Sequence, residues 1–217
     1  MKEIWTASFH CARVALPGLL VFAAGCAALH PVENNSRLYL LTATAASNAA
    51  QSNEQQAQKN ETVLVRPVGI ADFLKTKSIA VKTGSNELFL TQSHRWAEPL
   101  DLGIRRVLVE DLRRLVANPI LIREPLREPN PARSISVQVT EFGAVRHGNG
   151  YAVGLSASWQ FLDQRSILAR GQFNMPRTAW DGKNYDELAR NLSRGLGDLA
   201  EEISRAIAKE PSNGGGV

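Results

Sequence analysis

Apolar residues recur at helical spacing in two stretches of the chain. From Pro99 onward they return every three or four positions, which predicts a helix that ends before Asn118-Pro119. A second helix is predicted over Asn184–Lys209, where Gly195 and Gly197 each cost roughly 1 kcal/mol and so indicate a close contact with a sheet. Its apolar stripe, a core face or alternatively a site for a partner helix, consists of Tyr185, Leu188, Leu192, Leu196, Leu199, Ile203 and Ile207.

The remaining apolar positions alternate with polar ones and predict strands. Ser134–Phe142, Tyr151–Asp163 and Ser166–Met175 follow one another through short turns, so they should form an antiparallel meander with one polar face. Pro67 has no N–H to donate to a sheet, so the strand that contains it should end there or lie at the edge of the sheet. The earlier strands are predicted at Arg37–Thr42, Thr62–Val68, Ser78–Lys82 and Glu87–Thr91.

Two segments lack the apolar residues that a core needs. Residues 43–61 are rich in Ala, Ser, Asn and Gln and contain no aromatic or large aliphatic side chain. The small apolar area that residues 43–61 could bury would not offset the conformational entropy lost on ordering them, so a mobile polar insert or a weak helix is expected. A partner-binding segment is the alternative. Residues 210–217 are predicted to be a disordered tail.

The N-terminus has the pattern of an export signal. Residues 14–24 are uniformly apolar, too few to span a bilayer but suited to a signal peptide. Ala23-Ala24-Gly25 then precedes Cys26, and this resembles the lipobox of bacterial lipoproteins. The resemblance implies a lipoprotein signal peptide at 1–25, cleavage between Gly25 and Cys26, and a diacylglycerol on the Cys26 sulfur. An ordinary signal peptide and a buried N-terminal helix are the alternatives.

Under this interpretation, residues 26–36 are the lipidated cysteine and a tether, and 37–209 form one domain. The length of 217 residues suits one medium domain plus a targeting segment. The cysteines are Cys11 and Cys26, so the body of the chain has neither a disulfide nor a thiolate metal site.

Composition and motifs narrow the function classes. The formal charge is +4, from 25 basic and 21 acidic residues spread along the chain, so no nucleic-acid footprint is present. The four histidines are scattered and no catalytic motif occurs, so we expect neither an enzyme nor a bound cofactor or metal. The adjacent acids Glu110-Asp111 and Glu201-Glu202 are expected on solvated helix faces.

Several strings together resemble the ABC-type transport auxiliary lipoprotein family, the PqiC/YmbA-like group. The most specific is Arg95-Trp96-Ala97-Glu98-Pro99-Leu100. Phe73-Leu74-Lys75 departs from the tyrosine-leucine-aspartate usual in the family, and the insert after Leu41 is long for it. The other matching strings are Tyr39-Leu40-Leu41, Arg66-Pro67-Val68, Asp72-Phe73-Leu74, Val107-Leu108, Asp111-Leu112, the strand pair around Trp159 and the closing helix.

The resemblance implies an α+β fold, a mainly antiparallel mixed sheet with two principal helices packed on it. It also implies a non-enzymatic role beside a lipid transporter that has an MCE-domain periplasmic protein, a permease and an ATPase. The tether of about ten residues reaches at most about 35 Å, so the domain should dock an elongated partner that reaches toward it, as several copies around that partner. A structural lipoprotein of outer-membrane assembly and a periplasmic hydrolase are the alternatives.

The docking contact is expected at exposed turns with Arg or Trp side chains, types that are enriched in interface anchors. The candidates are Arg95, Trp96, Arg146, His147 and Asn149. For Trp96, a core anchor before a helix start is the alternative. Ala27 follows the lipid cysteine where enterobacterial lipoproteins kept at the inner membrane have aspartate, so an outer-membrane location is predicted.

Overall fold

A long hairpin is the centre of the fold. In the computed structural model, which describes residues 35–46, 61–116, 120–123, 133–164 and 166–210, β7 (Arg133–His147) and β8 (Gly150–Asp163) pair antiparallel along their whole lengths. The strand β9 (Ser166–Asn174) continues the antiparallel order beside β8, which confirms the predicted meander. Beyond it, β10 (Thr178–Trp180) pairs with the start of β8.

The opposite edge of β7 accepts three short strands in succession, all parallel to it. They are β2 (Glu61–Val65), β3 (Gly69–Ile70) and β4 (Ser78–Lys82), with the 3-10 turn η3 (Asp72–Leu74) between the last two. Next to β4 runs the antiparallel β5 (Leu88–Trp96), and β1 (Arg37–Tyr39) pairs parallel with the end of β5. The strand β6 (Ile120–Arg123) lies parallel to β2.

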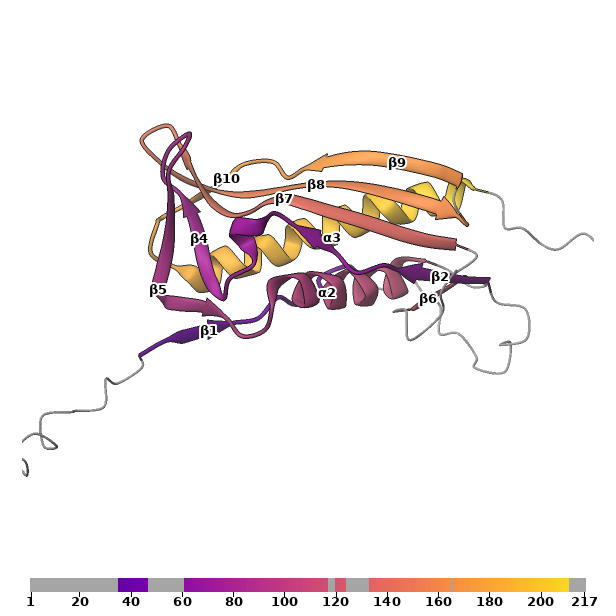
Figure 1. Cartoon of the computed structure of the whole chain (residues 1–217), viewed down its shortest axis with the longest axis horizontal. Coiled ribbons are helices and arrows are strands. Elements are labelled where there is room, and N and C mark those ends of the chain that lie inside the picture. Colours follow the sequence, from indigo (N-terminus) through magenta and orange to yellow (C-terminus); the bar gives the residue numbers. More distant parts are fainter. Residues whose placement is uncertain (1–34, 47–60, 117–119, 124–132, 165, 211–217) are drawn as a thin grey trace, which may run out of the picture. The chain divides into compact units, whose positions relative to one another are not determined.

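The described residues therefore form one ten-stranded mixed sheet whose longest pairings are antiparallel (Figure 1). The two helices, α2 (Leu100–Leu115) and α3 (Tyr185–Lys209), contact each other and the sheet. The expected α+β class is confirmed. The predicted signal peptide, Cys26 and residues 27–34 of the tether lie outside the described residues, as do residues 47–60 of the insert and 211–217 of the tail.

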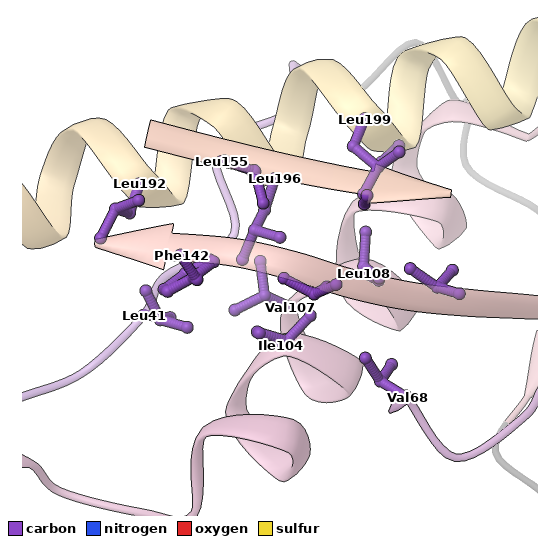
Figure 2. Close-up of a cluster of buried hydrophobic side chains, with 14 of the residues drawn as sticks. Leu41, Val68, Ile104, Val107, Leu108, Phe142, Leu155, Leu192, Leu196 and Leu199 are labelled. Atoms are coloured by element: carbon purple, nitrogen blue, oxygen red, sulfur yellow. The ribbon is translucent and has the colours of Figure 1, made fainter. Parts of the chain in front are cut away.

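The apolar stripe of α3 is core, as predicted. Six of its seven members are at most 1% exposed, Tyr185 being the exception. A methyl group added at Gly195 would lie 2.7 Å from the Met175 sulfur and 3.2 Å from a Leu155 methyl, so the glycine permits the predicted close approach to the sheet. In the core, side chains of α2 and α3 meet Phe142 of β7 and Leu155 of β8 (Figure 2).

The start of α3 offers a test of local structure. The Asn184 side chain accepts a hydrogen bond from the backbone N–H of Glu187 at 3.2 Å and caps the helix. We expect Asn184→Ala to lower the free energy of unfolding by about 1 kcal/mol, because the amide loses its partner. Urea denaturation monitored by tryptophan fluorescence would measure this loss. Asn174→Ala, at an exposed position at the end of β9, is the control that should leave the midpoint unchanged.

Candidate functional site

Two hairpin tips emerge side by side at one end of the sheet. Val81 and Lys82 of β4 are in register with Ala144 and Val145 of the parallel β7, so both strands end at the same place. The β4–β5 turn closes there through the Thr83 N–H, which donates to the Glu87 carbonyl at 3.1 Å. The β7–β8 turn passes through Gly148 at φ 56°. In Figure 1 the two loops lie next to each other.

An apolar groove of about 330 Å³ lies beside these tips. Ala80 and Lys82 of β4 share one face of the sheet with their β5 partners Leu90 and Leu88. Leu88 is 38% exposed, and Phe73 of η3, which also lines the groove, is 46% exposed. Large apolar side chains that remain this accessible next to one another are typical of interaction surfaces.

A second hollow of about 350 Å³ adjoins the groove and is basic. Lys82 lines both, and the second is also lined by Arg146, His147 and Arg177. Arg177 forms an ion pair with Glu141 at 2.5 Å, whereas the Arg146 guanidinium lies over the Tyr151 ring, 6.0 Å from its centroid. The predicted turn residues Arg146, His147 and Asn149 are all exposed, and the first two line the basic hollow next to the apolar groove. We call the two hollows together the tip groove.

The two other predicted docking residues lie elsewhere. Trp96 is 3% exposed and packs edge-to-face on Phe142, with ring centroids 5.9 Å apart. A buried indole offers no surface to a partner, so the alternative of a core anchor describes this residue. Arg95 is at the end of β5 away from the tip groove, opposite Leu38 of β1. The structure therefore separates the two groups of predicted residues.

A line of aromatic contacts connects the tip groove with β1. Tyr151 contacts Trp180 at 6.1 Å between centroids, and Trp180 contacts Tyr185 at 5.0 Å. Tyr185 stacks on His94 at 3.8 Å, and the Tyr39 hydroxyl lies 2.7 Å from His94 Nδ1. Burial, and secondarily the positive charge of Arg37, lowers the pKa of His94, so the neutral ring is favoured in this stack.

Residues Leu41–Ala45 form an extended strap bound to both helices. The N–H groups of Thr44 and Ala45 each donate to Asp111 Oδ1 of α2 at 2.8 Å. On α3, Ser193 accepts from the Thr42 N–H through its hydroxyl and from the Thr44 hydroxyl through its carbonyl. Two arginines of α2 complete the strap, Arg106 donating to the Leu41 carbonyl and Arg114 to the Ala43 carbonyl.

The strap corrects two sequence predictions. Residues 43–46 are ordered against the helices, so the polar insert does not begin at residue 43. Asp111, expected on a solvated face, is 0% exposed, and burial raises the pKa of its carboxyl despite the amides that it accepts from. Glu202 is likewise not simply solvated, because its carboxylate accepts from the Trp159 indole N–H at 2.7 Å.

The described residues contain no group of three or more His, Cys, Asp or Glu placed to hold a metal ion. Within the same part of the chain, no helix is both long and apolar enough to cross a membrane.

Comparisons with known proteins agree with this fold. The family model of the ABC-type transport auxiliary lipoprotein component matches residues 39–204. The intermembrane transport lipoprotein PqiC of Escherichia coli K12 is 25% identical over 190 residues, which cover 85% of this chain and 94% of PqiC. A crystal structure of a Xanthomonas campestris protein superposes with a TM-score of 0.63 at 17% identity, covering 78% of this chain and 93% of that one. An uncharacterized protein gives the same TM-score at 20% identity, over 79% of this chain and 98% of its own.

Proposed function

The chain belongs to the ABC-type transport auxiliary lipoprotein family, and on that premise we propose that it docks an elongated periplasmic MCE-domain partner through the tip groove. In this proposal the protein is lipidated on Cys26, acts without catalysis beside a permease and an ATPase, and faces the periplasm from the outer membrane. PqiC, by its name, is an intermembrane transport lipoprotein, which supports a role in transport between membranes.

The observation that carries the proposal is the combination of apolar and basic groups at the tips. Phe73 and Leu88 offer exposed apolar area beside the cations Lys82 and Arg146. An apolar centre desolvates on binding, while a rim arginine steers and orients an acidic partner. The pairing of β4 with β7 fixes the two hairpins relative to each other, so the surface exists before a partner binds. Little conformational entropy is then lost on association.

The tether explains why docking suits this domain better than carriage of lipid. Ten residues reach at most about 35 Å, so a domain held by Cys26 stays close to its own membrane. Transport between membranes then requires a partner that extends from the other side. The tip groove is the surface that we assign to that partner.

Docking can be tested by changing the groove without disturbing the core. We expect the triple variant Phe73→Ser, Leu88→Ser, Arg146→Glu to bind the MCE protein encoded beside this gene at least about tenfold more weakly, a loss of about 1.4 kcal/mol. The measurement is a titration of full-length lipidated protein in detergent by biolayer interferometry. Ile167→Ser in β9, where Ile167 is 48% exposed, is the matched control and should bind like the wild type. Equal binding of triple variant and control, or no binding by the wild type, would reject the proposal.

A further inference from the structure

The outer face of β1 exposes leucines immediately after the tether. Leu38 is 64% exposed and Leu40 is 56% exposed, the two most exposed large apolar side chains among the described residues. Alternation along the strand puts both on the face opposite Tyr39, which points into the aromatic line. These leucines therefore contribute nothing to the core, and their exposure needs another explanation.

Three cations lie at this end of the sheet. Arg95 of β5 is directly opposite Leu38 in the parallel register and so shares its face, whereas Arg37 precedes Leu38 and alternates to the Tyr39 side, at the edge of that face. Lys77 lies at the same end of β5, since its carbonyl accepts from the Trp96 N–H at 2.7 Å. Among the acidic side chains that the structure describes, none forms an ion pair with these three cations. Apolar side chains flanked by Arg and Lys are the combination that binds an anionic lipid surface.

The position of this face in the chain identifies the surface that it meets. Only residues 27–36 separate Cys26 from the first residue of β1. A flexible chain of that length has a typical span of about 17 Å, so an anchored domain keeps β1 within reach of the bilayer at all times. A tethered surface meets its target at high effective concentration, so even weak contacts are populated.

We infer that Leu38, Leu40 and Arg95, flanked by Arg37 and Lys77, form a membrane-contact face that rests on the anionic headgroups of the membrane holding the lipid anchor. The inference rests on the proposed lipidation of Cys26, because the tether is what brings β1 to the bilayer. The leucines enter the interfacial region, and the cations pair with phosphate groups around them. Arg95, predicted from the sequence as a contact for a protein partner, contacts lipid in this assignment.

The contact would give the domain a fixed orientation. From Arg95 to Leu88, β5 runs seven residues, or about 23 Å, toward the tip groove. A domain resting on β1 therefore holds the groove away from the bilayer, on the side from which a periplasmic partner arrives.

A fluorescent label on the face tests the inference in the intact protein. Cleavage before Cys26 removes Cys11, and lipidation blocks the Cys26 sulfur, so Leu40→Cys provides the single free thiol of the mature chain. The lipidated variant carries the polarity-sensitive dye NBD and is reconstituted in phosphatidylethanolamine–phosphatidylglycerol vesicles or in phosphatidylcholine vesicles. Ile167→Cys in β9, which pairs only with β8 among the described strands, is the matched control.

We expect several-fold brighter, blue-shifted emission from position 40 in the anionic vesicles, quenched by doxyl-labelled lipid, with no such change at position 167. Adding Arg37→Glu and Arg95→Glu should remove most of this gain, whereas Arg170→Glu on β9 should not. Identical behaviour of the two labels in vesicles that carry the protein would overturn the membrane-contact face and leave the anchor intact. Failure of the protein to float with vesicles, together with an N-terminal peptide mass that lacks acyl chains, would overturn both.

Discussion

Cys26→Ser is expected to abolish lipidation and to leave an uncleaved precursor. Serine has no thiol to accept the diacylglycerol, and the peptidase that cuts before a lipidated cysteine then has no substrate. The precursor should therefore keep its first 25 residues. Two or three acyl chains anchor a protein stably, whereas the unprocessed precursor contacts the membrane through the apolar residues 14–24 of its uncleaved signal segment and carries no acyl chain. The measurement is metabolic labelling with a palmitate analogue, combined with flotation of membranes and the mass of the N-terminal peptide.

Cys11→Ser is the matched control, because Cys11 lies in the predicted signal peptide. That variant should be processed, labelled and membrane-bound like the wild type. In a sucrose gradient the wild type should band with the outer membrane, as Ala27 predicts, and Ala27→Asp should shift it toward the inner-membrane fractions of an enterobacterial host. A Cys26→Ser protein that still matures and carries lipid would contradict the assignment of the anchor.

Asp111→Ala should be strongly destabilising. Its carboxylate is the acceptor for the N–H groups of Thr44 and Ala45, and alanine leaves both without a partner against a buried helix face. A buried donor that loses its acceptor costs about 1–3 kcal/mol, and the Thr44 N–H is only partly buried, so we expect a loss of about 2–4 kcal/mol in the free energy of unfolding. Urea denaturation of the full-length protein would measure it. Asp111→Asn retains a carbonyl acceptor and should lose less than half as much.

A comparison of the wild type with Asp111→Asn tests the raised pKa of Asp111. Because burial raises the pKa of the carboxyl above its ordinary value of 3.8, the folded chain holds the proton more tightly than the unfolded chain does. The resulting stability is present below the unfolded pKa and is lost as the pH rises through the folded pKa. Wild type should therefore lose stability relative to Asp111→Asn as the pH rises from the ordinary pKa of 3.8 through the raised pKa of the folded chain. A difference between the two that is independent of pH would show that burial does not control this carboxyl.

Local patterns predicted the elements that bury a regular stripe. The α3 stripe and the β7–β8–β9 meander follow directly from spacing and alternation, because each contacts the core with one face. The short strands β3, β6 and β10 were not predicted, since two to four residues carry no periodicity. The strand β5 extends to Trp96, past the predicted end at Thr91, because its polar second half pairs with β1 rather than with an apolar layer.

Long-range contacts account for the other differences. The predicted first strand, Arg37–Thr42, ends at Tyr39. The residues that follow form the strap instead, because they hydrogen-bond to both helices rather than to a neighbouring strand. Nothing near Asp111 in the sequence indicates that its partners lie 66 and 67 positions away. The sequence named Arg146 and His147 by residue type, and the structure places both beside the apolar groove. Phe73 and Leu88 join them only through the parallel pairing of β4 with β7, which no local pattern indicates.

The strap also determines how the domain responds to tension. A pull on the chain before β1, such as the proposed lipid anchor would transmit, enters the fold at β1, where three residues are paired with β5. Beyond them the load reaches six hydrogen bonds that hold Leu41–Ala45 to both helices. The short strand should yield first and lengthen the leash by about 10 Å, after which the strap stops further extension. A domain fastened in this way can be displaced over a small distance while its helices and long strands stay folded.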